Sequence, residues 1–313
     1  MRKTILLILI TILLISLCSC ELSMEQPKQG NVHILVYGND YHYGSGALNC
    51  TVKDAVNVGM ALSKLCEKQS VSYHAKYIYG LDSSYDSEID KLPNSERSHN
   101  LSAAYLLQSI QNLKTEAQEG DMTFIFFSGH GNSDYTDKNH MVDYGTDTSK
   151  GGVFVARKTE SSTENVNILV SLLREMIEAI PGAKIVFADF CFSGTLVQPG
   201  YVSVSGYEYN SMDATKLFSL KSEICESSSS FYLSASRYYE KSWEKDKHGY
   251  FTQALLDALG WDEKSRTIKI GGAYKNGNIT FFNVANYTMN HDNETRQNPM
   301  YSGGSNDIIL FSF

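Results

Sequence analysis

The chain has 313 residues, with 27 Lys and Arg against 35 Asp and Glu, and a formal net charge of −8. Hydrophobic residues make up 42% and charged residues 20%, which are globular proportions and exclude a largely disordered chain. The acidic balance excludes a sequence-independent nucleic-acid-binding protein, because such a protein needs a basic surface. The length allows one large domain or two small ones.

The N-terminal residues 1–20 have the pattern of an export signal. Arg2 and Lys3 precede an almost wholly apolar run, residues 5–17, which is too short to span a bilayer comfortably. A basic start followed by a short apolar run is typical of a secretory signal peptide. Residues 21–30 are polar and are predicted to form a short tether.

The end of the apolar run resembles a bacterial lipobox. Leu17 stands three residues before Cys20, and the small Ser19 stands directly before it. This pattern predicts that Cys20 becomes a lipidated N-terminus and anchors an exported protein to a membrane of the bacterial cell envelope. Ordinary signal cleavage and an uncleaved anchor remain open as alternatives.

Residues 31–313 are predicted to form one domain in which strands and helices alternate. Apolar or alternating runs predict strands at 32–37, 72–79, 122–127, 183–188, 230–234 and 308–311. Helical spacing predicts helices at 54–68, 101–116, 166–180, 251–259 and 281–289, with polar loops at 81–99 and 132–151. This order indicates an α/β fold, a three-layer sandwich whose mostly parallel central sheet has helices on both faces.

Four cysteines remain once the signal segment is set aside: Cys50, Cys66, Cys191 and Cys225. The sequence has no CxxC pair and no Cys/His spacing typical of zinc ligands, so no metal or other cofactor is expected. Lone cysteines are most often small buried apolar residues, which is the interpretation for all of them except Cys191.

Reactive side chains follow two of the buried strands. The strand at 122–127 leads into His130, and the strand at 183–188 leads into Cys191, each beside glycine. If these strands are neighbours, both side chains face one crevice at the carboxyl ends of the strands. His130 could then take the thiol proton of Cys191, while the N–H groups of Gly131 and Cys191 hold the oxyanion. Taken singly, a histidine is usually structural or solvated and a cysteine usually lies in the core.

At these residues the sequence resembles the caspase-like cysteine peptidases. Phe-Phe-Ser-Gly-His-Gly (126–131) is similar to the catalytic-histidine motif of that family. Asp-Phe-Cys-Phe-Ser-Gly (189–194) resembles the nucleophile motif of metacaspases and bacterial caspase homologues, Asp-x-Cys-x-Ser-Gly. Weaker similarity extends over residues 48–54, 234–256 and 297–299. The resemblance implies a caspase-type fold over residues 31–313 and a Cys191–His130 dyad.

The resemblance to metacaspases also implies an acidic pocket for the residue before the scissile bond. The matching positions are Asp54, Ser128 and Asp189. Two carboxylates in one pocket repel each other unless a cation enters, which favours Arg or Lys in the substrate. The alternatives are a helix-dipole role for Asp54 and a structural acceptor role for Asp189. Cleavage after Asp would need a basic pocket, for which Arg237 is a weak candidate.

The sequence therefore predicts a cysteine endopeptidase that acts on peptide or protein substrates with Arg or Lys before the scissile bond. A catalytically silent caspase-fold binding protein and a cysteine hydrolase of another acyl substrate remain alternatives. The stretch after Cys191 has no acid, so the calcium site of some metacaspases is not expected. Four basic residues are candidate self-cleavage points: Lys138, Lys150, Arg157 and Lys158.

Overall fold

Seven strands form the central sheet. The computed structural model describes residues 30–41, 47–132, 152–197, 230–303 and 307–313. The strand order is β14-β9-β8-β4-β1-β2-β3, and within these ranges every neighbouring pair is parallel except β14 with β9. The bounds are β1 Val32–Gly38, β2 Tyr73–Tyr79, β3 Ser95–Ser98, β4 Met122–Ser128, β8 Ala183–Asp189, β9 Ser230–Ser234 and β14 Met300–Ser302.

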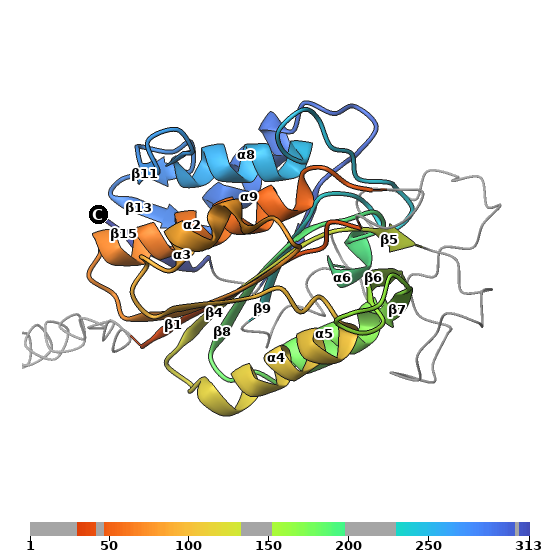
Figure 1. Ribbon diagram of the computed structural model, residues 1–313. Helices are drawn as coiled ribbons and strands as arrows, with labels where there is room; N and C mark the ends of the chain where they lie inside the picture. Colours follow the sequence, from red (N-terminus) through yellow and green to blue (C-terminus); the bar gives the residue numbers. More distant parts are fainter. Residues whose placement is uncertain (1–29, 42–46, 133–151, 198–229, 304–306) are drawn as a thin grey trace, which may run out of the picture.

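Helices cover both faces of this sheet, as Figure 1 shows. One face carries α2 (Thr51–Lys68), α8 (Tyr250–Leu259) and α9 (Phe281–His291), and the other carries α4 (Ala103–Glu116) and α5 (Val170–Glu178). The carboxyl ends of the parallel strands lie together at the right-hand edge in Figure 1, beside α6 (Gly194–Val197) and a small sheet of β5 (Gly131–Asn132), β6 (Val153–Arg157) and β7 (Asn165–Leu169).

The remaining elements are short. The polar stretch after β2 contains η1 (Ser83–Tyr85) and α3 (Asp86–Ile89). Near the C-terminus, β10 (Trp261–Asp262) pairs with β11 (Thr267–Ile268), and β12 (Tyr274–Lys275), β13 (Asn278–Thr280) and β15 (Ile309–Ser312) form a second small sheet. The small C-terminal strands lie on the side of α8 and α9 and leave the carboxyl edge of the central sheet to other segments (Figure 1).

The central strands are mostly apolar because both of their faces are buried. In β4, Phe124 and Phe126 pack under α2 and its neighbours, whereas Ile125 and Phe127 pack under α4 and α5. The same alternation divides β1 and β8 between the two cores. A strand of a sheet with helices on both faces must be hydrophobic at successive positions, which is why these runs were readable in the sequence.

The predicted three-layer α/β arrangement is confirmed, and most predicted elements are present within a few residues of their expected bounds. The helix predicted to end at Gly260 does so, with that glycine at φ 79° in the left-handed region. The prediction of a helix over 166–180 is wrong in its first turn, because Asn165–Leu169 forms β7. Val166 and Ile168 are buried at strand spacing while also fitting a helical pattern with the residues that follow.

Among the strands that were not predicted are β3 and β6. The segment 81–99, predicted to be a loop, contains the edge strand β3, whose side chains are at least partly exposed. An exposed polar edge strand lacks the apolar signal that marks a buried one. The strand β6 was not predicted either.

Several sequence predictions lie outside the described residues. These are the signal peptide 1–20 with Cys20, the tether apart from Gly30, most of the 132–151 loop, Cys225, Lys138 and Lys150. In the part of the chain that the structure describes, no helix is long and apolar enough to cross a membrane.

A buried ion pair joins β6 to the segment that follows β1. The Nη2 atom of Arg157 lies 2.7 Å from Oδ1 of Asp40, and both side chains are almost wholly buried. The other Asp40 oxygen accepts a hydrogen bond from the backbone N–H of Leu81 at 3.0 Å. Arg157 therefore lies inside a paired strand with its side chain enclosed, which makes it unsuitable as the self-cleavage point considered above.

Arg157→Met is expected to lower the free energy of unfolding by about 3–5 kcal/mol, because it leaves the Asp40 carboxylate buried without its cation. Urea unfolding followed by circular dichroism measures this. The adjacent Lys158→Met is the matched control, since Lys158 pairs with Glu164 at the surface, and it should change stability by less than about 0.5 kcal/mol. Equal effects of the two variants would contradict the assignment.

Candidate active site

The backbone places His130 and Cys191 at equivalent positions on neighbouring strands. Strands β4 and β8 are parallel neighbours, and Ser128 at the end of one pairs with Asp189 at the end of the other. His130 and Cys191 each follow two residues later. The Gly129 N–H donates to the Asp189 carbonyl at 3.2 Å, so the ladder continues beyond the strands. The two strands that the sequence analysis assumed to be neighbours are thus neighbours in the structure.

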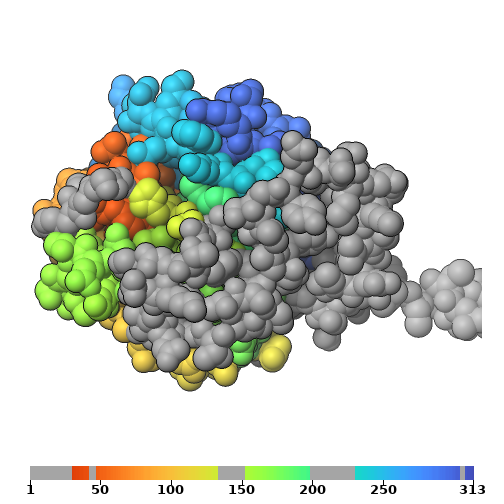
Figure 2. Space-filling view, turned by 90° about the vertical axis from the view of Figure 1, so that its right-hand side faces the viewer, coloured from red at the N-terminus to blue at the C-terminus, as the bar shows by residue number. Residues whose placement is uncertain are grey.

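Gly131 allows the two segments to touch. A Cβ atom built at Gly131 would lie 1.9 Å from the Cys191 carbonyl oxygen, so only glycine fits there. Burial raises the pKa of the Cys191 thiol, and a hydrogen bond from the backbone N–H of Gly131 offsets a small part of that rise. In Figure 2, which faces this edge of the sheet, the yellow segment after β4 and the green segment after β8 lie beside the cyan segment around 240–250.

The Cys191 thiol is partly enclosed and remains protonated until a base acts on it. Burial raises the pKa of the Cys191 thiol, and the nearby Asp189 raises it further. The Sγ atom donates a hydrogen bond to the Ser242 carbonyl at 3.6 Å. The next residue, Phe192, has φ 63° in the left-handed region and donates its N–H to the Glu240 carbonyl at 2.8 Å. A raised thiol pKa means that nucleophilic attack requires a proton acceptor such as an imidazole.

His130 is held by its backbone on two sides. Its N–H donates to the Tyr41 hydroxyl at 2.7 Å, and its carbonyl accepts from the Val155 N–H at 3.0 Å. The ring centroids of Tyr41 and His130 lie 4.4 Å apart. His130 is partly exposed.

The three residues predicted to line the substrate pocket lie in one buried cluster. Asp54, in the first turn of α2, accepts a hydrogen bond from the Ser128 hydroxyl at 3.3 Å and from the Gly249 N–H at 3.2 Å. Its other oxygen lies 2.6 Å from Nδ1 of His248. Burial raises the pKa of Asp54, and the contact with His248 opposes that shift.

Asp189 is buried behind Cys191 and is also fully engaged. It accepts from the Ser242 hydroxyl at 2.6 Å and from the Thr252 hydroxyl and N–H at 2.6 and 3.2 Å. Burial and the neighbouring Asp54 raise the pKa of Asp189 to about 7. Each of the two acidic side chains therefore has protein donors, although the charge of Asp54 still contributes to the raised pKa of Asp189. The structural roles considered as alternatives for Asp54 and Asp189 fit this resting geometry.

Four residues of this site were missed by sequence reasoning: Tyr41, Ser242, His248 and Thr252. The last three lie in the segment 234–256 that resembled the family, but no local pattern assigned them a task. Tyr41 is one of 20 tyrosines and stands in no recognised motif. The signal that could have found them is their position in the chain. Tyr41 follows β1, Ser242 and His248 lie between β9 and α8, and Thr252 lies in the first turn of α8.

Arg237 pairs with residues of its own segment. Its guanidinium donates to the Tyr239 hydroxyl at 2.8 Å and lies 3.8 Å from a Glu240 carboxylate oxygen. These contacts give no support to Arg237 as the basic residue of a pocket for Asp.

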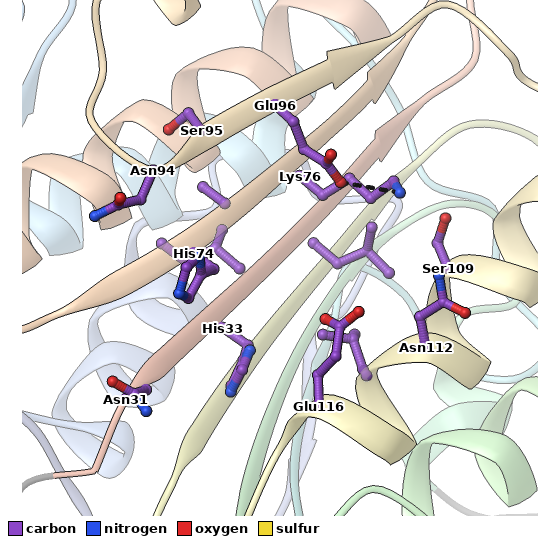
Figure 3. Close-up of a pocket in the computed structure, with 14 residues that line it drawn as sticks. Asn31, His33, His74, Lys76, Asn94, Ser95, Glu96, Ser109, Asn112 and Glu116 are labelled. Atoms are coloured by element: carbon purple, nitrogen blue, oxygen red, sulfur yellow. Dashed lines mark ion pairs between the residues drawn. The ribbon is translucent and has the colours of Figure 1, made fainter.

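A hollow of about 750 Å³ lies near the amino ends of β1 and β2, away from Cys191. Figure 3 shows its lining, with His33 and His74 on adjacent strands and Glu116 and Asn112 on α4. His33 pairs with Asp121 at 3.1 Å. In the described ranges, no group of three or more His, Cys, Asp or Glu side chains is arranged to hold a metal ion.

The sequence model of the caspase domain, a peptidase family, matches residues 32–307, and the chain therefore belongs to this family. A comparison with curated proteins found no match. The resemblance stated from the two motifs is confirmed at the level of the family.

Among solved structures, protein GSU0716 from Geobacter sulfurreducens is similar, with a TM-score of 0.54 and 15% identity over 90% of this chain and 97% of that one. Caspase-1 from Spodoptera frugiperda aligns with a TM-score of 0.49 and 13% identity over 93% of this chain and 92% of that one. At such identities the likeness concerns the fold alone.

The raised pKa of Asp189 predicts a pH dependence of stability. Its pKa rises from 3.8 to about 7 on folding, so the folded state keeps a proton that the unfolded chain releases. The resulting stabilisation is present at pH 4 and is lost as the pH rises through 7. Asp189→Asn should therefore flatten the dependence of the unfolding free energy on pH between these values.

Urea unfolding at intervals across that range measures the effect. Asp90→Asn is the control, because pairing with Arg97 lowers the pKa of Asp90 and moves its titration below the window. An Asp189→Asn slope as steep as that of the parent protein would contradict the prediction.

Proposed function

We propose that the chain is a cysteine endopeptidase that cleaves after Arg or Lys, with Cys191 as nucleophile and His130 as general acid and base. The observation that carries this proposal is the pairing of Ser128 with Asp189, which brings the two motif segments to one edge of the sheet. Membership of the caspase domain family supports peptidase chemistry.

The chemistry follows from the groups at that edge. His130 takes the proton of the Cys191 thiol, whose raised pKa makes such a base necessary. The thiolate attacks the scissile carbonyl carbon, and the N–H groups of Gly131 and Cys191 stabilise the oxyanion. The imidazolium then protonates the leaving amine, and water activated by the same imidazole hydrolyses the thioester.

The preference for a basic residue rests on the cluster of Asp54, Ser128 and Asp189. Asp189 lies two residues before the nucleophile, so a substrate side chain next to the scissile bond can reach it. The Ser242 hydroxyl, 2.6 Å from Asp189, is the donor that an entering guanidinium or ammonium group replaces. Charge-assisted hydrogen bonds of Arg or Lys to carboxylate are stronger than a neutral hydroxyl contact, which favours this exchange.

Fluorogenic peptides with Arg, Lys, Asp or Leu before the scissile bond test the function. We expect turnover of the Arg or Lys peptides, and Cys191→Ala should lower it by roughly 10³-fold or more. Cys66→Ala is the matched control, because Cys66 is a buried free cysteine on α2.

Three outcomes would revise the proposal. Turnover of the Asp peptide alone would contradict the pocket and keep the nucleophile. Turnover of an ester but of no peptide would indicate another acyl hydrolase. A folded protein inactive on every substrate, before and after limited trypsin treatment, would indicate a binding protein.

We also propose that Cys20 carries a lipid anchor, on the support of the basic start, the apolar run and the lipobox-like end of the signal. Expression of the full chain in a bacterial host with labelled palmitate tests this. Cys20→Ser should abolish labelling and detergent partitioning, whereas the neighbouring Cys18→Ser should leave both unchanged. An unlabelled parent protein would overturn the proposal.

A further inference from the structure

Tyr41 occupies a position that no motif of the sequence marked. It lies three residues after the end of β1, the strand that neighbours β4, and its side chain is 5% exposed. Its backbone has φ 48°, in the left-handed region that residues with a Cβ atom rarely adopt. Its N–H donates to the Asn39 side chain at 3.3 Å. A strained backbone at the edge of a site invites a search for what the side chain does.

The hydroxyl of Tyr41 links His130, which lies between β4 and β5, to Val155 of β6. It accepts the His130 N–H at 2.7 Å and donates to the Val155 carbonyl at 2.6 Å. Val155 in turn donates its own N–H to the His130 carbonyl at 3.0 Å. One oxygen thus serves as acceptor and donor at once, a pair of tasks that a phenylalanine ring cannot perform.

The neighbouring glycine makes room for this contact. A Cβ atom at Gly129 would lie 2.6 Å from the Tyr41 hydroxyl oxygen, so the hydroxyl could not approach if that residue had a side chain. The Tyr41 ring also lies against the imidazole, with a 4.4 Å separation of centroids and an interplanar angle of 47°. The contact therefore restrains both the backbone and the ring of His130.

We propose that Tyr41 is a positioning residue that fixes the His130 imidazole for proton exchange with Cys191. The inference rests on the proposed function, since it assigns His130 the role of base. Burial raises the pKa of Tyr41, so the hydroxyl keeps the proton that it donates to Val155. Displacement of a catalytic group by about 1 Å can cost 10²-fold in rate, so a lost backbone anchor is measurable.

Tyr41→Phe tests the proposal, with Tyr37→Phe as the matched control. Tyr37 is a buried tyrosine of β1 whose hydroxyl donates to the Leu101 carbonyl at 2.7 Å, so the control also removes one buried hydrogen bond. Tyr41→Phe is expected to lower kcat on the best peptide by about 10–100-fold, with KM changed less than about threefold. Tyr37→Phe should leave both constants within about twofold, and equal kcat values for the two variants would overturn the proposal.

A second measurement does not depend on peptide turnover. The rate of Cys191 alkylation by iodoacetamide, read by peptide mass spectrometry across pH 5–10, reports the coupling of thiol and imidazole. The Tyr41→Phe profile should move from that of the parent protein toward that of His130→Ala, and the Tyr37→Phe profile should not move. Failure of the proposed function would appear as absent turnover, whereas failure of this inference would appear as an unmoved Tyr41→Phe profile.

Gly129→Ala provides an independent variant in case Tyr41→Phe does not fold. Its added methyl group displaces the Tyr41 hydroxyl while the tyrosine stays in the chain. The same loss of kcat and the same movement of the alkylation profile are expected. A folded Gly129→Ala variant with the parent profile would overturn the proposal.

Discussion

The pairing of Ser128 with Asp189 is the constraint on which the site depends. Because β4 and β8 are parallel and in register, the residues that follow them leave the sheet at the same level. A slip of one residue would turn every side chain of a strand to the other face and would place one apolar core against the other helix layer. The two hydrophobic cores therefore fix the register, and the register fixes where His130 and Cys191 stand.

In the acidic cluster of Asp54, Ser128 and Asp189, the two carboxyl groups already accept hydrogen bonds from the protein. From the sequence, Asp54 and Asp189 could be treated as two negative charges waiting for a cation. In the folded protein each is surrounded by donors, from His248 and Gly249 in one case and from Thr252 in the other. A basic substrate side chain would thus compete with these internal hydrogen bonds. The affinity for such a substrate would depend on how much stronger its bonds to the two acids are than the internal bonds that they replace.

The fold and the two strands that lead into His130 and Cys191 were predictable because their signals are local. Continuous apolar runs at 122–127 and 183–188 mark strands with both faces buried, and the glycines beside His130 and Cys191 mark sharp departures from them. The contacts of Tyr41 and His248 could not be predicted, since each joins residues about 90 or more positions apart. The strand β7 before α5 was predicted as helix because residues 166–169 satisfy both strand and helix spacing.

Two glycines flank His130, and each admits a different neighbour. Gly129 admits the hydroxyl of Tyr41, and Gly131 admits the backbone of Cys191. The imidazole is consequently the one side chain that this three-residue stretch presents. The two acids of the buried cluster come instead from the start of α2 and the end of β8, and Ser242 and Gly249 in the segment before α8 donate hydrogen bonds to them. Under the proposed function, the segment before α8 that holds Asp54 and Asp189 can therefore diverge among descendants of this gene without any change in the stretch 129–131 that holds the base.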